Sequence, residues 1–250
     1  MWRRLQDYEE VLTDDRHRRE AAGAGVPLIL NWSGSVTVDG DTFAAGFVAG
    51  PSDRYGDTVN RGHARGVQVD LDLVAARRVL GRPLSELAGR VVAVTDVWGA
   101  DGRRLVERLA EAPTTAARAG IVAAFLRDRP DPCPAPDAAV VAVRGLAGNA
   151  GVAAVADGIG VGRQHLHRLV TREFGVAPRT LRRLVRFQGV LDAVRGGRVP
   201  SLAALAVEHG YYDQAHLHRD CRAFAGLTPM ELLRLHSSNP ASAEAVTVTA

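Results

Sequence analysis

The side chains whose chemistry stands out are glutamines, threonines and arginines on one side of two short segments. Gln164, Arg168 and Thr171 are spaced for one face of a helix, and Arg219 and Arg222 stand in the same way 51 residues further on. An arginine can form two parallel hydrogen bonds with guanine O6 and N7, and a glutamine with adenine N6 and N7. Such side chains on an exposed helix face suit the major groove of double-stranded DNA.

The same segments contain closely spaced histidines, which raise the question of a metal site. His165 and His167 lie in the first segment, and His216 and His218 in the second. Positions i and i+2 of a helix point in directions about 200 degrees apart, whereas helical metal ligands usually sit at i and i+4. We therefore expect no metal ion at these histidines.

Catalytic chemistry has little support in the first half of the chain. His17 and His63 are the histidines there, and neither has the close spacing with a glutamate that a metal-binding cupin shows. Cys133 and Cys221 lie far apart, without the spacing of a zinc site or a disulfide framework. We expect no enzymatic activity, no catalytic residue and no cofactor.

Both segments belong to an internal repeat. Residues 152–156 (VAAVA) recur as 202–206 (LAALA), 165–168 (HLHR) as 216–219, and 175–178 (GVAP) as 226–229 (GLTP). The offset is 50 residues in the first block and 51 in the others, so the second copy has one extra residue in its turn. Each copy is interpreted as a short helix, a turn with glycine and a longer helix, which is the helix-turn-helix arrangement. Asp213 is placed to cap the longer helix of the second copy.

A single helix over residues 179–194 is predicted between the copies. It presents Arg182, Arg183 and Arg186 to solvent or to phosphate groups. Gly189 is its weak point, since glycine costs about 1 kcal/mol relative to alanine inside a helix. A stiff helix here is expected to hold the two longer helices in successive major grooves, about 34 Å apart.

The stretch 202–229 (LAALAVEHGYYDQAHLHRDCRAFAGLTP) resembles the signature of the AraC/XylS-type bacterial transcription regulators. The resemblance covers about 100 residues, and implies an all-α domain of seven helices with two helix-turn-helix units joined by a linker helix. It departs from the family pattern at Cys221 and Gly162. It implies base contacts at Gln164, His167, Arg168, Gln214, Ala215, His216 and Arg219. The residues that we add as expected DNA contacts are Arg163, Thr171, Arg183 and Arg222.

Positive charge is concentrated in the same region. Residues 140–236 contain 13 arginines and 7 acidic residues, a net charge of +6, whereas the rest has 18 arginines and 21 acidic residues. Because every Lys+Arg position is arginine on an Ala-, Gly- and Val-rich background, a GC-rich bacterial genome explains part of this count. The distribution of the charge is the better argument for nucleic acid.

The first half of the chain has a different pattern. Alternating apolar residues between positions 27 and 73 predict strands, and the segments 74–80, 101–110 and 114–126 predict helices. This half resembles, more loosely, the truncated cupin-like sensor domain of some AraC-type regulators. The predicted fold is thus an α+β cupin-like domain followed by an all-α domain. The predicted divisions are a sensor or dimerisation domain (1–128), a proline-rich linker (129–137), the DNA-binding domain (138–236) and a disordered tail (237–250).

The sequence therefore predicts a sequence-specific transcription regulator that responds to an effector or partner through its first domain. The alternative is a DNA-binding module whose first domain is only a dimerisation scaffold. Trp32, Phe47, Tyr55 and Trp98 could line an effector pocket, but core packing is the preferred explanation, and no ligand residue is assigned. The expected partners are double-stranded DNA, a small-molecule effector, RNA polymerase and a second copy of the chain. Since no apolar run approaches about 18 residues, we expect a soluble cytoplasmic protein, associated with the nucleoid and not with a membrane.

Overall fold

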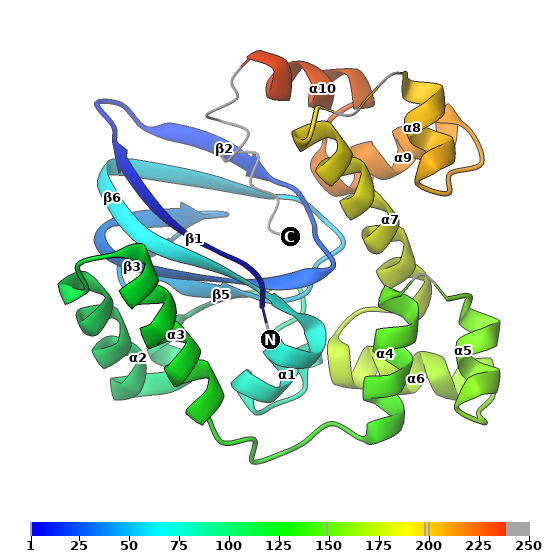
Figure 1. The fold of residues 1–250 in the computed structure, drawn as a ribbon, viewed down its shortest axis with the longest axis horizontal. Coiled ribbons are helices and arrows are strands. Elements are labelled where there is room, and N and C mark those ends of the chain that lie inside the picture. The colour runs from blue at the N-terminus through cyan, green and yellow to red at the C-terminus, as the bar shows by residue number, and fades with distance from the viewer. Residues whose placement is uncertain (1, 149, 198, 200, 239–250) are drawn as a thin grey trace.

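An antiparallel sheet occupies the first part of the chain and helices the rest (Figure 1). The computed structural model describes residues 2–148, 150–197, 199 and 201–238. Within these residues the strands are β1 (Trp2–Val11), β2 (Arg16–Glu20), β3 (Gly25–Val38), β4 (Asp41–Phe43), β5 (Phe47–Ala49), β6 (Gly56–Asp72) and β7 (Val91–Ala93). The helices are α1 (Leu73–Leu80), η1 (Leu84–Glu86), α2 (Val94–Glu111), α3 (Thr115–Asp128), α4 (Asp137–Ala147), α5 (Val152–Gly158), α6 (Arg163–Phe174), α7 (Pro178–Arg195), α8 (Leu202–Glu208), α9 (Gln214–Ala225) and α10 (Pro229–Ser238).

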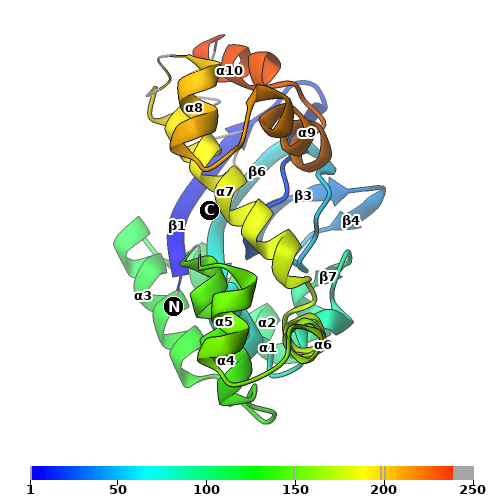
Figure 2. The same ribbon diagram turned by 90° about the vertical axis from the view of Figure 1, so that its right-hand side faces the viewer.

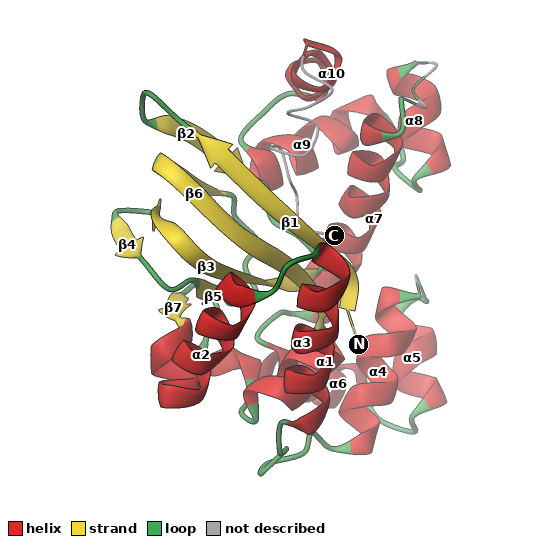
Figure 3. Cartoon of the chain, turned by 60° about the vertical axis from the view of Figure 1, so that its left-hand side comes forward, coloured by secondary structure: helices red, strands yellow, loops and turns green. Residues whose placement is uncertain are grey.

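The long strand β6 organises the sheet (Figure 3). The strand order is β1-β6-β3-β5-β7, with β2 also paired to β6 and β4 to β3. The first half of β6 pairs with β2 and its second half with β1, so these two short strands share one edge of β6. Irregular pairing between β3 and β6 near Ser33 interrupts the ladder, and such bulges increase the local twist of a sheet.

The two faces of the sheet differ in what they contact. Val26, Leu28 and Leu30 of β3 are buried in the main core, together with alternate residues of β6. Helices α1, α2 and α3 lie against the sheet, with α2 on β3 and α1 on β6. Val36 and Phe47 belong instead to a second, smaller apolar cluster. This second face lines the cavity described below.

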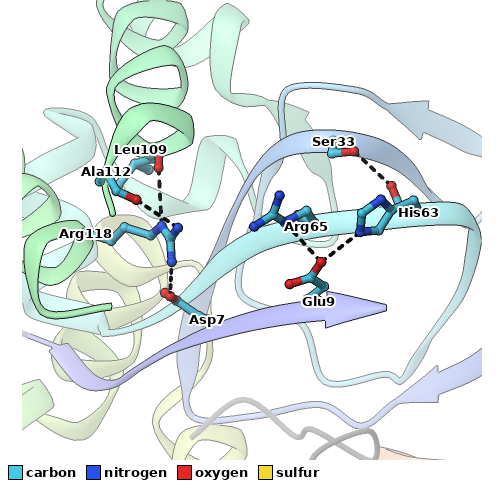
Figure 4. A network of polar contacts seen from close by, with 8 residues as sticks. All are labelled: Asp7, Glu9, Ser33, His63, Arg65, Leu109, Ala112 and Arg118. Atoms are coloured by element: carbon cyan, nitrogen blue, oxygen red, sulfur yellow. Dashed lines mark hydrogen bonds and ion pairs between the residues drawn. The ribbon is translucent and has the colours of Figure 1, made fainter. Parts of the chain in front are cut away.

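Strand β1 is tied to the helical layer by one arginine (Figure 4). Arg118 of α3 donates to Asp7 of β1 at 2.5 Å, and also to the carbonyl oxygens of Leu109 at 3.3 Å and Ala112 at 2.9 Å. The neighbouring Glu9 forms exposed ion pairs with two residues of β6. The guanidinium group thus joins an edge strand to the turn between α2 and α3.

The strands β1 and β2 were missed by the sequence prediction, which began the strands at residue 27. Elsewhere the predicted helices correspond to α1, α2 and α3, although α2 starts at Val94 rather than near residue 101. Residues 129–136 form neither helix nor strand, in keeping with their prolines, and α4 begins at Asp137, the last residue of the predicted linker. The last helix, α10, continues to Ser238, past the predicted start of the tail at residue 237. The remainder of that predicted tail, 239–250, lies outside the described residues.

The C-terminal helices form two groups along α7, one of α4, α5 and α6 and the other of α8, α9 and α10 (Figure 2). Their buried residues are continuous with those under the sheet, so one core joins the two halves of the chain. Of the described residues, no helix is long and apolar enough to cross a membrane.

Candidate DNA-binding surface

The first helix-turn-helix unit consists of α5 and α6. Leu166, Val170 and Phe174 of α6 are fully buried, which agrees with the predicted inward stripe. The helix starts after Gly162, which offers no side-chain cap, and ends at Gly175 in the left-handed conformation. The inward stripe therefore fixes which side of α6 is presented to solvent.

The second unit consists of α8 and α9 and repeats this arrangement. Leu217, Cys221 and Phe224 form its buried stripe. The predicted cap is confirmed, since the side chain of Asp213 accepts a hydrogen bond from the backbone N–H of His216 at 2.6 Å. The extra residue is also confirmed in the turn, because four residues separate α5 from α6 and five separate α8 from α9.

Most of the predicted DNA contacts lie on exposed surfaces of α6 and α9. Thr171 and His216 are half-buried. The predicted residues that are exposed are Arg163, Gln164, His167, Arg168, Gln214, Ala215, Arg219 and Arg222. Arg219 donates to a backbone carbonyl of its own helix, and Arg222 lies 3.7 Å from a carboxylate oxygen of Glu231. Within the described residues, the side chains of Gln164 and Arg168 have neither a hydrogen bond nor an ion pair.

Arg183, a predicted phosphate contact, is paired with a residue of the second unit. Its guanidinium group donates two hydrogen bonds to one carboxylate oxygen of Asp220, at 2.7 and 3.1 Å, and lies 4.8 Å from the ring centre of Phe224. Asp220 is 1% exposed. The expectation that Arg183 contacts phosphate stays a prediction: its guanidinium group is bound to a buried carboxylate, and its side chain is still 39% exposed. Arg183 joins α7 to α9.

The glycine in α7 permits a close helix contact. A Cβ atom on Gly189 would lie 2.6 Å from Nδ1 of His209, which follows α8. The side chain of Arg186, one turn earlier, lies over the ring of Tyr211 at 5.3 Å. The predicted weak point in α7 is thus the place where the second unit approaches this helix.

The end of α6 contacts the sheet domain through a buried ion pair. Arg77 of α1 donates to one carboxylate oxygen of Glu173 at 3.1 and 3.2 Å, with the side chains 2% and 6% exposed. A Cβ atom on Gly175, the last residue of this unit's cap, would lie 2.9 Å from the carbonyl oxygen of Leu84. Because removing one partner of a buried pair costs about 3 to 5 kcal/mol, this contact holds α6 firmly against the first domain.

The end of α9 contacts the sheet domain at the equivalent place of the repeat. The backbone N–H of Ala22 donates to the carbonyl oxygen of Phe224 at 2.7 Å. A Cβ atom on Gly226 would lie 2.7 Å from the ring of Tyr55 and 2.8 Å from the guanidinium of Arg19. Gly226 and the corresponding glycine of the first unit are 51 residues apart, so the first domain holds both longer helices at matching positions.

The second face of the sheet lines a cavity of about 340 Å³. One wall, from β3, β5 and β7, is apolar and contains Ile29, Val36, Val38, Phe47, Ala49 and Val91. The adjoining wall, from β1, β2 and β6, is polar and contains Gln6, Tyr8, Glu10, Arg16, Arg18, Glu20, Thr58, Asn60 and Gln68. The cavity thus offers an amphipathic lining to a small molecule.

The two glutamates in the polar wall, Glu10 and Glu20, differ in whether hydrogen-bonding partners offset the effect of burial on their pKa values. Burial alone would raise the pKa of Glu10, but hydrogen bonds from Asn60 and Arg18 bring that pKa below its ordinary value. Burial raises the pKa of Glu20 to about 8, although Arg18 and Arg195 oppose this shift. Burial also raises the pKa of the Tyr8 hydroxyl, which donates to Asn31.

The sequence prediction found few of the residues around this cavity. Phe47 and Tyr55 line it, whereas Trp32 and Trp98 do not. Trp98 packs edge-on against Phe125 in the core, at 5.0 Å between ring centres. No apolar alternation marks the charged strands of the polar wall, so only their pairing with β6 identifies them. Among the described residues, no group of three His, Cys, Asp or Glu side chains could hold a metal ion.

Comparisons with known proteins agree with this architecture. A family model described as a helix-turn-helix domain matches residues 155–235. A structure of ToxT from Vibrio cholerae at 1.65 Å resolution has a TM-score of 0.52 and 10% identity, over 93% of this chain and 98% of that one. Another ToxT structure has a TM-score of 0.50 and 11% identity, over 93% and 97%. A third, bound to (E)-4-(8-methylnaphthalen-1-yl)but-3-enoic acid, has a TM-score of 0.52 and 10% identity, over 93% and 98%.

A search of curated proteins finds no match. At 10 to 11% identity the structural likeness establishes the fold, and the family model identifies a helix-turn-helix domain over residues 155–235. Residues 155–235 of this chain therefore match a helix-turn-helix domain, joined to an antiparallel sheet domain, and the whole has the fold of the ToxT structures.

Proposed function

We propose that a small molecule in the sheet-domain cavity controls how this regulator binds DNA. The observation that carries this proposal is a direct contact between the cavity lining and the second helix-turn-helix unit. Ala22 and Tyr55 line the cavity, and the same residues contact Phe224 and Gly226 at the end of α9. A ligand that moves this lining therefore moves the support of a DNA-reading helix.

The cavity has the properties of a small-molecule site. Its volume of about 340 Å³ lies in the range of about 300 to 1,000 Å³ that is usual for ligand pockets. Adjoining apolar and polar walls can hold a molecule in one orientation. A ToxT structure of this fold carries a bound arylbutenoic acid, which supports the use of the fold for small ligands.

DNA reading is proposed to use the exposed faces of α6 and α9 on one double-stranded site. Gln164 and Arg168 supply the hydrogen-bonding groups of the first unit, and Arg219 those of the second. Their freedom from strong internal partners supports this role, since groups already paired would have to break those contacts. The helix α7, fixed to both units, sets the spacing between the two half-sites.

The experiment begins with selection of bound sites from random DNA by the full chain. Small molecules from a library are then screened for those that raise the melting temperature of the protein. The DNA affinity is measured in the presence of each of these molecules. We expect at least one such ligand to change the dissociation constant for DNA by about tenfold, the scale of ordinary allosteric coupling. If no ligand that binds changes the affinity, the sheet domain is a scaffold for dimerisation, which is the competing function.

Two pairs of variants connect the effect to the proposed route. Val36→Trp fills the cavity from its apolar wall, and Val11→Trp, at a residue 77% exposed, is its control. Arg19→Ala removes a contact with the end of α9, and Arg61→Ala removes an exposed arginine whose ion-pair partner among the described residues is Asp15 of the first domain. We expect the cavity variant to abolish ligand binding, and Arg19→Ala to keep ligand binding but weaken its effect on DNA.

A further inference from the structure

We infer that the effector is an amphipathic cation, with an organic ammonium group held by the carboxyl group of Glu20 and an apolar part on the β3, β5 and β7 wall. This inference rests on the proposed function, because it names the chemical class that the cavity takes. It follows from which polar groups of the cavity already have partners.

The apolar wall adjoins the polar one, since Val36 pairs with Asn60 and Val38 with Thr58 across β3 and β6. Val36, Val38 and Phe47 belong to one buried cluster, against which Ile29 and Val91 pack. These residues line the cavity, so the apolar surface of a ligand is removed from contact with water when the ligand occupies that side. The ligand therefore needs an aliphatic or aromatic part of modest size.

Two arginines of the polar wall are paired with the same carboxylate, although the buried Nε of Arg18 has no hydrogen-bond partner among the described residues. Arg18 forms a hydrogen-bonded ion pair with Glu10, and Arg16 lies 3.6 Å from the same carboxylate. Asn60 donates to the second oxygen of Glu10 at 2.9 Å. A ligand carboxylate would have to compete with Glu10 for both guanidinium groups. The other cavity arginines, Arg54 and Arg90, are exposed to solvent.

Glu20 is the polar-wall carboxyl group that lacks such a partner. In the described part of the chain it forms no hydrogen bond and no ion pair, while it lines the cavity. The charged groups around it are Arg18 of β2 and Arg195 of α7, opposed by Asp70 of β6 and Glu10 of β1. The two arginines do not offset the effect of burial on the Glu20 carboxyl group, since its pKa is about 8.

An ammonium group would supply what this site lacks. A carboxyl group whose pKa is raised to about 8 is mostly neutral near pH 7, and a cation within hydrogen-bonding distance favours its ionised form. At neutral pH, a ligand that arrives as the ammonium ion therefore displaces the proton of Glu20 into solvent. The resulting ion pair has one carboxylate and one ammonium group, and no other charge in the wall has to change.

The test uses the full chain and three probes that differ only in their polar end: 4-phenylbutylamine, 4-phenylbutyrate and 4-phenylbutanol. Binding is measured by titration calorimetry near neutral pH, in two buffers with different enthalpies of ionisation. We expect the amine to bind about tenfold or more tightly than the other two, with release of a proton. At pH values below the pKa of Glu20, the affinity of the amine should increase about tenfold for each unit by which the pH is raised. The reason is that a smaller fraction of Glu20 then carries a proton that the amine must displace.

Variants assign the effect to one group. Glu20→Gln should weaken the amine about tenfold or more, abolish the proton release and leave 4-phenylbutanol unchanged, while Glu107→Gln on the exposed face of α2 should change nothing. A melting temperature at least equal to that of the unmodified chain would show that the Gln variant is folded. Val36→Trp should abolish binding of all three probes.

Three results would overturn the inference. Preference for 4-phenylbutyrate, or equal binding of the amine to Glu20→Gln, would assign the site to another ligand class and leave the proposed function intact. Failure of all three probes would also reject the cation. The library screen on DNA affinity would then decide separately whether the cavity controls DNA binding at all.

Discussion

Replacing Arg183 by alanine separates two roles of the linker helix α7. In the sequence interpretation this residue contacts a DNA phosphate, and in the structure it binds Asp220 of α9. If it contacts phosphate, the variant should weaken binding to all sequences and lower the salt dependence by about one charge. If it positions α9, the variant should destabilise the folded protein first.

The structure gives the magnitude of the second effect. Asp220 is 1% exposed, and Arg183→Ala would leave this carboxylate without its ion-pair partner. Breaking a buried pair costs about 3 to 5 kcal/mol, and we take the lower end, about 3 kcal/mol, because the Arg183 side chain is 39% exposed. Loss of the contact with the Phe224 ring acts in the same direction.

The assay is denaturant unfolding together with DNA affinity at several salt concentrations. Arg179→Ala, at an exposed residue near the start of the same helix, is the control. The double variant Arg183→Ala/Asp220→Ala should regain part of the lost stability, because it no longer buries an unpaired carboxylate. A stability change below about 0.5 kcal/mol with a reduced salt slope would refute the positioning role and restore the phosphate contact.

Four further substitutions test other parts of the domain. Asp213→Ala should lower the free energy of unfolding by about 0.5 to 2 kcal/mol through loss of the α9 cap, as denaturant unfolding would show; an unchanged value would mean that the cap is unimportant. Gly189→Ala should destabilise the protein although alanine favours helices, because its Cβ would lie 2.6 Å from the imidazole of His209; a rise in melting temperature would contradict this. Arg168→Ala and Arg219→Ala should each cost about 1 to 3 kcal/mol of DNA binding and relax different base pairs in site selection; relaxation at the same positions would refute the two-groove arrangement.

The C-terminal units could be predicted because their information is local and is present twice. The inward stripe of α6, with Leu166 and Val170, and the cap at Asp213 depend on residues within one or two turns. Because the sequence pattern occurs twice, a helix assigned in one copy can be checked against the corresponding segment of the other copy. Local periodicity and capping chemistry were sufficient for this part of the fold.

The cavity wall could not be predicted, for a physical reason. A strand is recognised by an apolar face, but β2 (Arg16–Glu20) consists of charged residues and a histidine. Its inward side faces a cavity rather than an apolar core, so the usual alternation is missing. Pairing with β6, some 40 residues away, makes it a strand. Ion pairs such as that of Arg77 with Glu173, 96 residues apart, are likewise set by tertiary structure.

The two contacts between the domains differ in their relation to the cavity. The contact at Glu173 is a buried ion pair with α1, and Arg77 does not line the cavity. The contact at Gly226 is made by Tyr55, which does line it. A ligand under the proposed function would therefore act on α9 while α6 stays anchored. Because α7 joins both units, movement of α9 alone changes the spacing of the two reading helices, and with it the preferred distance between half-sites.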